Sequence, residues 1–195
     1  MPSSPSTRRA AALPPDERRS AIVAATIPLV AAHGDAVTTR QIADAACIAE
    51  GTIFRVFADK DAVMAGVLDS VMDPAPLDEA IAAIDAALPL EQRLLAAVSL
   101  LAERTLKVWS IVSGVGPRHQ EHARQPLADS GALVALLRPD ADRFRLDPLL
   151  AARTLRAMTL ALTHPLLTPE PFQPDQIVAT FLHGALAAGD RGDRC

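Results

Sequence analysis

Aromatic residues are scarce in this chain: its 195 residues include five phenylalanines, one tryptophan and no tyrosine. Half of the residues are apolar, and alanine and leucine are the most prominent among them. Strands are enriched in aromatic and β-branched side chains, whereas alanine and leucine favour helices. The composition therefore predicts a helical protein, and the length suits one or two small domains with a substantial core.

Cysteine and long apolar runs are also lacking. Cys47 and Cys195 are too few for a disulfide scaffold and suit a reducing compartment. No apolar run approaches the roughly 18 residues of a membrane span, and residues 1–13 lack the apolar segment of a signal peptide. We therefore expect a cytoplasmic protein without a membrane partner. No second thiol neighbours Cys47, so we expect it to be buried and inert.

Catalytic motifs are missing as well. The chain has no G-x-S-x-G, no P-loop and no dinucleotide fingerprint, which argues against an enzyme and against a bound cofactor. The strongest competing cluster is His119, Glu121 and His122, whose imidazoles and carboxylate are suitable metal ligands. Their spacing is not that of HExxH, so a solvated loop is the favoured interpretation and a metal-dependent enzyme the third hypothesis.

Positive charge is not in excess overall, because the net charge is −4. It is unevenly distributed, however. Residues 1–60 hold seven bases and six acids, whereas the remainder holds twelve bases and seventeen acids. The local potential steers a nucleic acid. Arg40, Arg55 and Lys60 would share one side of the N-terminal region, and this thin positive patch indicates modest affinity per subunit.

The most informative segment is residues 38–60, TTRQIADAACIAEGTIFRVFADK. Thr38 and Gln41 have the spacing of a capping box, which predicts a helix start. Residues 47–49 would form a corner, and residues 50–57 a second helix. Ile53 and Phe57 lie four residues apart and would face inward. The segment is therefore interpreted as a helix-turn-helix.

The outward face of the second helix carries the chemistry of base recognition. A helix-turn-helix places the start of its second helix in the major groove of DNA. Arg55 can donate to guanine there, while the methyl group of Thr52 and the side chain of Val56 can contact thymine methyl groups. The spacing alone favours DNA binding only weakly, because many helical proteins contain such a corner.

Residues 16–68 resemble the DNA-binding domain of TetR-family transcriptional regulators. The matching segments, in order and at the family's distances, are residues 31–34 (AAHG), 38–43 (TTRQIA), 51–57 (GTIFRVF) and 59–61 (DKD). The resemblance implies an all-α fold: an N-terminal three-helix helix-turn-helix domain with a connecting helix over residues 15–73, and a helical ligand-binding and dimerisation domain over residues 74–195. Residues 1–14 would be a disordered tail.

Four positions depart from the family pattern. Cys47 stands where glycine is usual, which costs about 1 kcal/mol if the left-handed backbone is kept. Phe54 replaces a common tyrosine whose hydroxyl contacts phosphate. Glu50 replaces a frequent lysine, and Val56 a frequent histidine or tyrosine. These changes bear on operator sequence and affinity rather than on the fold.

The resemblance assigns DNA-backbone positioning to Thr39, Arg40, Phe54 and Lys60, and base reading to Thr52, Arg55 and Val56. With the residues beside them, the candidate DNA-binding set is Thr38, Thr39, Arg40, Glu50, Gly51, Thr52, Phe54, Arg55, Val56 and Lys60.

Beyond residue 74 we expect helices near 77–88, 90–113, 127–138, 147–163 and 174–188, punctuated by proline and glycine. The resemblance implies an effector cavity among them, with candidates Trp109, His119, Phe144, Met158 and Leu162. It also implies a dimer interface on the last two helices, with candidates Leu149, Ala152, Leu155, Thr159, Ile177, Phe181 and Ala185. The alternative for both sets is that they only fill the subunit's own core.

The resulting hypothesis is a ligand-responsive, sequence-specific DNA-binding regulator. It would be a repressor that binds a palindromic operator in double-stranded DNA as a homodimer and is released by a small hydrophobic effector. The alternative is a helical small-molecule-binding protein with a weakened DNA-binding unit, as the departures at Cys47, Glu50 and Phe54 suggest.

Overall fold

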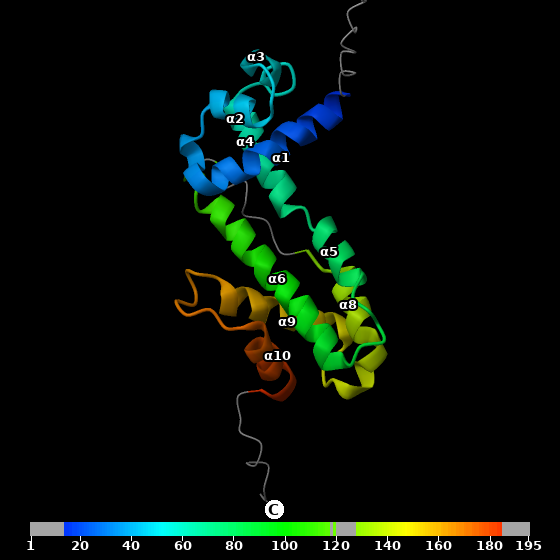
Figure 1. The fold of residues 1–195 in the computed structure, drawn as a ribbon. Helices are drawn as coiled ribbons and strands as arrows, with labels where there is room; N and C mark the ends of the chain where they lie inside the picture. Colours follow the sequence, from blue (N-terminus) through cyan, green and yellow to red (C-terminus); the bar gives the residue numbers. More distant parts are fainter. Residues whose placement is uncertain (1–13, 118, 120–127, 185–195) are drawn as a thin grey trace, which may run out of the picture.

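The first helix begins and ends at the signals that the sequence supplies. The computed structural model describes residues 14–117, 119 and 128–184 (Figure 1). Helix α1 spans Pro15–His33 and starts with a proline, whose missing N–H is no loss at this position. It continues through Pro28 and ends at Gly34, which has a φ of 57°. A short 3-10 turn, η1, follows over Gly34–Ala36.

Helix α2, Thr39–Ala45, is fixed at its start by the predicted capping box. The backbone N–H of Gln41 donates to the Thr38 hydroxyl at 3.2 Å, and the backbone N–H of Thr38 donates to Gln41 Oε1 at 2.8 Å. Both donors would otherwise lack a partner at a helix N-terminus. The prediction of a helix start at this point is confirmed.

The corner after α2 is a Schellman motif. Cys47 donates to the carbonyl of Asp44 at 3.2 Å, and Ile48 donates to the carbonyl of Ala43 at 3.0 Å. This pairing needs a left-handed residue after the helix, and Cys47 supplies it with a φ of 53°. A cysteine therefore adopts the backbone for which glycine is the usual residue. Cys47 is exposed, so the expectation of a buried cysteine is wrong.

Helix α3 is shorter than predicted. It covers Glu50–Ile53, and turns follow over residues 54–56 instead of a continuous helix to residue 57. Arg55 donates to the carbonyl of Thr52 at 3.3 Å, and Val56 to that of Ile53 at 3.0 Å, so the chain tightens into three-residue turns. Glycine and the β-branched residues of this segment favour a helix only weakly. The predicted inward pair is nevertheless confirmed, because Ile53 and Phe57 are buried.

Helix α4, Lys60–Met72, is capped by Asp59, whose Oδ1 accepts from the N–H of Ala62 at 2.7 Å. Helices α1 to α4 form the upper lobe in Figure 1. Its core is one cluster of buried apolar side chains, which includes Ile22, Val30, Ile42, Ile53, Phe57, Val67 and Leu68.

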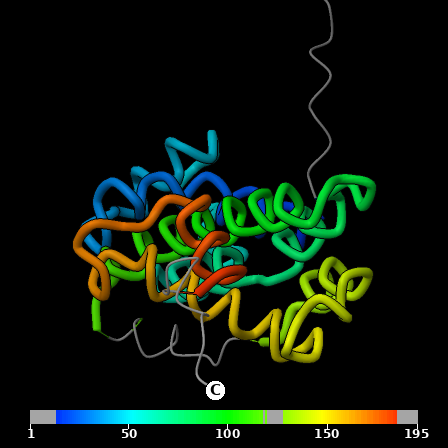
Figure 2. Tube along the Cα trace, turned by 90° about the horizontal axis from the view of Figure 1, so that it is seen from below, coloured from blue at the N-terminus to red at the C-terminus, as the bar shows by residue number. Residues whose placement is uncertain are grey.

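The lower lobe consists of α5 (Ala75–Ala82), α6 (Leu90–Val112), α8 (Gly131–Leu137), the 3-10 segment η2 (Arg138–Arg143), α9 (Pro148–Thr163) and α10 (Pro174–His183). Helix α10 packs on both α6 and α9, as the view from below shows (Figure 2). The side chains of Ile81, Leu94, Leu133, Leu155 and Ile177 belong to a second buried cluster.

Three of these helices are shorter than the predicted 77–88, 127–138 and 174–188. Helix α5 ends at Ala82, and Asp85 then holds a turn by accepting from the N–H of Ala87 at 2.9 Å. Helix α8 starts only at Gly131, because Ser130 caps it through the N–H of Leu133 at 3.1 Å. Helix α10 ends at Gly184, whose φ is 74°.

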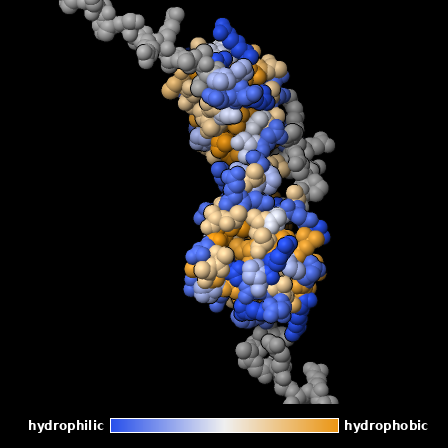
Figure 3. All heavy atoms as spheres, turned by 90° about the vertical axis from the view of Figure 1, so that its right-hand side faces the viewer, coloured by the Kyte–Doolittle hydropathy of each residue, from blue (hydrophilic) through white to orange (hydrophobic). Residues whose placement is uncertain are grey.

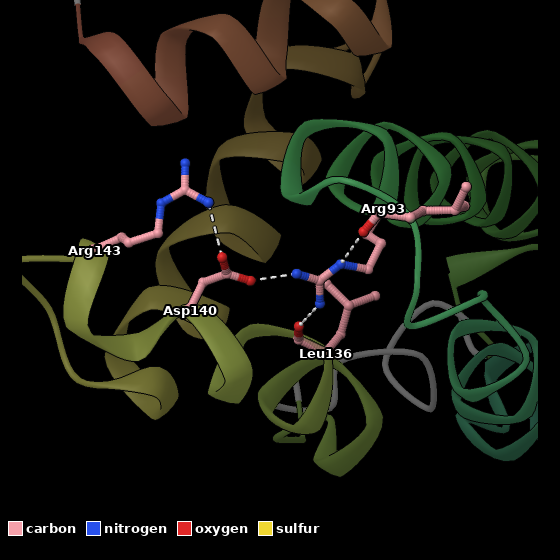
Figure 4. Close-up of polar contacts among 5 residues, drawn as sticks. Arg93, Leu136, Asp140 and Arg143 are labelled. Atoms are coloured by element: carbon pink, nitrogen blue, oxygen red, sulfur yellow. Dashed lines mark hydrogen bonds and ion pairs between the residues drawn. The ribbon is translucent and has the colours of Figure 1, made fainter.

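A buried arginine closes the lower end of this lobe (Figure 4). Arg93, on α6, is 5% exposed and donates to the carbonyls of Leu88 and Leu136 at 3.1 and 2.7 Å. It also donates to Asp140, which accepts from Arg143 at 2.8 Å as well. Because the guanidinium is hydrogen-bonded on several sides, its charge is tolerated inside the lobe.

Helix α6 joins the two lobes. It runs from α8 at the bottom to α1 at the top, where Ile111 enters the upper core together with Val115 (Figure 1). At this junction the N–H of Asp35 donates to the carbonyl of Gly114 at 2.9 Å. The space-filling view shows the two lobes, each with apolar side chains at the surface among polar ones (Figure 3). The upper cluster draws its side chains from residues before 74 and from Val108, Ile111, Val112 and Val115, whereas the lower cluster starts at Leu77.

The described part of the chain contains helices and turns but no strand, so the predicted all-α class is confirmed. Within those residues no helix combines the length and the apolar character that crossing a bilayer requires.

Candidate nucleic-acid interface and internal pocket

The ten candidate DNA-binding residues all reach the surface of the upper lobe. Thr38, Arg40, Glu50, Gly51, Phe54 and Arg55 are exposed, whereas Thr39, Thr52, Val56 and Lys60 are partly buried. They come from the start of α2, from α3 with the turns after it, and from the start of α4. Helices α2 and α3 pack on each other, so the candidate residues of these two segments lie in one region of the upper lobe.

An arginine of α1 supports the segment after α3. The guanidinium of Arg19 stacks on the ring of Phe57, 4.3 Å from its centroid, and its Nη1 donates to the carbonyl of Val56 at 3.4 Å. A cation over an aromatic face is attracted by the ring quadrupole. Arg19 therefore fixes the backbone that presents Arg55. Sequence reasoning missed this role, because nothing in the spacing of α1 links it to residue 57.

Two of the candidate positioning residues are already engaged within the protein. The hydroxyl of Thr39 donates to Glu50 Oε1, which links α2 to the start of α3. Lys60 donates from Nζ to the carbonyl of Asp35, and its Nζ lies 3.6 Å from Asp35 Oδ1. A phosphate oxygen would have to share or replace these partners.

The two arginines of the surface differ from Lys60. Within the described residues, no hydrogen bond or ion pair engages the side chains of Arg40 or Arg55. Exposed guanidinium groups without carboxylate partners can donate to phosphate oxygens or to the O6 and N7 atoms of guanine. These two side chains are therefore the candidate cations of this surface that have no described partner to exchange for DNA.

A pocket of about 420 Å³ opens between the end of α4, α5, α6 and α9. Its apolar walls include Met72, Leu77, Leu101, Val108, Trp109 and Leu160, and its polar groups are Arg104, Thr105, Arg156 and His164. The rings of Trp109 and His164 pack on each other at a tilt of 58°, with centroids 4.6 Å apart. The volume is in the range of small-molecule sites.

Of the five residues predicted to line an effector cavity, Trp109 lines this pocket. The predicted cavity residues His119, Phe144, Met158 and Leu162 lie outside the lining, and their grouping is corrected. Phe144 packs on Phe181, with centroids 5.8 Å apart, and His119 lies beside Asp61 of the upper lobe, with Nε2 3.8 Å from Oδ1. Apolar periodicity identifies inward faces but not which inward faces enclose a space.

Arg104 and Arg156 are the pocket residues that sequence reasoning missed. A signal for Arg104 was available, because it interrupts the apolar stripe of α6 between Leu101 and Val108. Burial lowers the pKa of both arginines, and the charge of Arg156 lowers the pKa of Arg104 further. Both groups keep their charge at neutral pH, because guanidinium is protonated over the whole physiological range. The pocket therefore contains two cations that repel each other.

Arg104 also connects the pocket to α4. Its two terminal nitrogens donate to the carbonyls of Met72 and Asp73 at 2.7 and 2.8 Å. These carbonyls end helix α4, where a helix has no partners of its own for them. The pocket and the C-terminal end of α4 thus share one side chain.

The predicted subunit-interface stripe is largely internal. Ala152, Leu155, Thr159 and Ile177 are buried within the subunit's own core, so their assignment to a dimer surface is corrected. Phe181 packs partly on Phe144, Leu149 is 39% exposed, and Ala185 lies outside the described residues. The stripes face the core because α6, α8 and α10 cover α9 from several sides.

The alternative metal site involves residues that the structure does not describe. Glu121 and His122 lie in the segment 120–127, outside the described residues, as does Cys195 at the chain end. Among the residues that are described, no three metal-binding side chains come together.

The comparison with known families agrees with this geometry. Residues 22–67 match the family model of bacterial regulatory proteins, tetR family. This range contains α2, α3 and most of α4. No curated protein matches the chain.

Solved structures share its fold at low sequence identity. A protein of Mesorhizobium loti assigned to the TetR family of transcriptional regulators superposes with a TM-score of 0.64, at 17% identity over 88% of this chain and 98% of that one. The TetR-like regulator LfrR of Mycobacterium smegmatis, in complex with proflavine, superposes with a TM-score of 0.55, at 20% identity over 88% of this chain and 98% of that one. The fatty acid degradation regulator FadR of Bacillus halodurans superposes with a TM-score of 0.56, at 18% identity over 86% of this chain and 99% of that one.

Proposed function

We propose that this chain, whose residues 22–67 belong to the tetR family of bacterial regulatory proteins and whose fold is that of TetR-family regulators, is a ligand-responsive repressor. As a member of that family it is a DNA-binding transcription factor and not an enzyme. The repressor would act in the cytoplasm, bind a palindromic operator as a homodimer and leave it when a small molecule fills the pocket.

The exposed start of α3 carries the proposal for DNA. Its apolar side chains are directed into the upper core, and the polar ones around Arg55 remain available to a duplex. We assign base reading to Thr52, Arg55 and Val56, and backbone contact to Arg40 and Phe54. Thr39 and Lys60 would contact phosphate in addition to their partners Glu50 and Asp35.

The pocket supports the response to a ligand. A protein of this fold, LfrR, holds proflavine. In this chain Arg104 links the pocket to the end of α4, whose opposite end carries Lys60 at the proposed DNA surface. A ligand can shift the protein between two states only if it binds one of them more tightly, and a shift from 1:99 to 99:1 needs about 5.5 kcal/mol of preference.

Two subunits are proposed because one subunit offers few cations to DNA. A two-fold dimer presents two α3 segments about one helical turn of DNA apart and reads a palindrome. The exposed side of α9 and the residues after it remain available for this contact, since Leu150 is 45% and Leu166 71% exposed.

The test is binding to duplexes from the DNA upstream of the chain's own coding sequence, measured by fluorescence anisotropy against scrambled duplexes of the same length. We expect a preference for one upstream sequence. Arg55→Ala should weaken that complex by about 1–3 kcal/mol and leave scrambled DNA little affected. Arg138→Ala, an exposed arginine of the lower lobe, is the control and should change neither.

A second candidate is a small-molecule-binding protein with a weakened DNA-binding unit. The carboxylate of Glu50 on α3, which occupies the Thr39 hydroxyl, favours it, because an acid repels phosphate. Equal and weak binding of the wild-type protein to all duplexes would support this candidate over the repressor. Equal losses on every sequence in Arg55→Ala would make Arg55 a phosphate contact.

A further inference from the structure

The charge of the pocket indicates the chemical class of its ligand more specifically than its volume does. Two arginines line it, and no carboxylate does among the described residues. Asp73 and Asp78 act to raise the pKa of Arg104, and Asp78 and Asp129 that of Arg156, but none of these three acids lines the pocket. Asp78 also accepts from the Ser130 hydroxyl at 2.6 Å, and Asp129 pairs with Arg153 at 2.7 Å. The described lining of the cavity therefore carries two cations and no anion, while carboxylates behind it offset part of that charge.

The two guanidinium groups have donors left for a ligand. The described hydrogen bonds use two N–H groups of Arg104, toward Met72 and Asp73, and one of Arg156, toward the carbonyl of Ala128. A guanidinium carries more donors than these bonds occupy. A single anionic group between the two arginines would accept from both and offset the repulsion by which Arg156 lowers the pKa of Arg104.

Apart from Thr105 and His164, the remaining wall is apolar, and much of it follows α6. Leu101, Val108 and Val112 recur at the spacing of one helix face, and Trp109 and Leu160 complete the wall. Such a surface fits a hydrocarbon body rather than a polar one.

From this arrangement we propose that the effector is an amphipathic organic anion, whose carboxylate or phosphate lies between Arg104 and Arg156 and whose apolar body lies along α6 toward Trp109. The inference rests on the proposed ligand-responsive function and names the chemical class of its ligand. The anion would also affect the end of α4, because it competes for the Arg104 guanidinium that donates to the carbonyls of Met72 and Asp73.

The chain contains one tryptophan, and that tryptophan lines the pocket. Intrinsic fluorescence of Trp109 in the full-length protein therefore reports directly on occupancy. The probes are decanoate, decyl phosphate, decanol and decylamine, which share an apolar chain and differ in the head group. We expect decanoate or decyl phosphate to bind at least about tenfold more tightly than decanol, since a charged hydrogen bond contributes about 1.5–3 kcal/mol. The difference between the two anions identifies the head group.

Variants separate the arginines from the apolar wall. Arg156→Met should reduce the affinity for decanoate to that for decanol, whereas Arg156→Lys should keep a preference for the anion. Arg145→Met, an exposed arginine outside the lining, is the control and should bind as the wild type does. Circular dichroism checks that each variant keeps its helices.

Equal binding of decanoate and decanol, a preference for decylamine, no binding of any probe, or an unchanged preference in Arg156→Met would each overturn the proposal. Operator binding, measured on the same samples, distinguishes this failure from failure of the proposed function. A protein that prefers decanoate but binds no duplex would support the anion site and contradict the proposed role as a repressor. A protein that binds its operator but none of the probes would support the role as a DNA-binding regulator and contradict the anion site.

Discussion

Gly34 lies where the upper lobe meets the end of α6, and it combines two constraints. Its φ of 57° is a backbone conformation that side chains disfavour. A Cβ at this position would lie 2.2 Å from the carbonyl oxygen of Gly114, far inside van der Waals contact. That same oxygen accepts from the N–H of Asp35, so it cannot move away without breaking a bond between the lobes.

Gly34→Ala should therefore destabilise the protein by at least about 2 kcal/mol, because the left-handed conformation alone costs about 1–2 kcal/mol and the clash adds to it. Urea unfolding followed by circular dichroism measures the change. Gly131→Ala is the matched control: nothing lies within 4 Å of its Cβ, and alanine favours the helix that starts there. We expect that variant to be as stable as the wild type or slightly more so. A Gly34→Ala protein of wild-type stability would show that the junction is not rigid.

Single residues also decide how much of the site the sequence could predict. Thr38 and Gln41 form their capping box within one turn, so a local pattern was sufficient. The corner after α2 could also be predicted from neighbouring residues, although Cys47 rather than glycine adopts its left-handed backbone. The environment of Glu50 could not be predicted in this way, because its partner Thr39 belongs to another helix.

At the scale of whole elements, Arg93 connects three segments of the lower lobe. It binds the turn before α6, the end of α8 and Asp140 of η2 (Figure 4). Arg93→Met keeps most of the side-chain volume but leaves the carbonyl of Leu136 and the carboxylate of Asp140 without this donor. We expect a loss of about 3 kcal/mol, the usual cost of breaking a buried charged network. Arg143→Met, whose side chain is largely exposed, should cost much less. Equal losses in urea unfolding would contradict the role assigned to Arg93.

The cluster of Arg93, Asp140 and Arg143 makes the stability of the lower lobe depend on pH. Hydrogen bonds from Arg143 and then Arg93 hold the pKa of Asp140 below its ordinary value. A carboxyl whose folded pKa is lowered stabilises the fold fully above its unfolded pKa, and this contribution is lost as the pH falls through the folded pKa. The stability difference between the wild type and Arg143→Met should therefore be present at neutral pH and shrink below about pH 4.

Urea unfolding at a series of pH values measures this difference. Arg138→Met serves as the control, because Arg138 is an exposed neighbour without a described partner, and its effect should not vary over the same range. A difference between the wild type and Arg143→Met that grows on acidification would contradict the assignment.

Element packing also explains where sequence reasoning about the lower lobe failed. The periodicity of residues 147–163 correctly predicts a helix with an apolar stripe, and α9 has that stripe. A stripe of Ala152, Leu155 and Thr159 can face its own subunit or a partner, and periodicity is the same in both cases. The structure buries it in the subunit because α6, α8 and α10 surround α9. Arg104 and Arg156 come from different helices, so only the packed lobe reveals that they share a pocket.

At the scale of the molecule, the question is how the pocket and the DNA surface influence each other. They lie in different lobes, and α4 extends from one to the other (Figure 1). Its first residue, Lys60, is held by Asp35, and its last carbonyl groups are held by Arg104. The helix is thus anchored at both ends by a cation, one at the proposed DNA surface and one in the pocket.

Removal of the lower anchor should alter DNA binding even without a ligand. In Arg104→Met the carbonyls of Met72 and Asp73 lose a charged donor, and the end of α4 becomes free to move. We expect operator affinity to fall by roughly tenfold, which corresponds to about 1.4 kcal/mol. Amide hydrogen exchange in the last turn of α4 should become faster, because its opening free energy is reduced.

Lys107→Met provides the matched control, since Lys107 is an exposed cation of the same helix, outside the pocket lining. It should change neither operator affinity nor exchange. Faster exchange in Arg104→Met with unchanged affinity would mean that the end of α4 moves without consequence for DNA. The link between the lobes would then have to pass through the other contacts of this region, which are the packing of α6 on α1 and α4 and the Gly34–Gly114 junction just after α6.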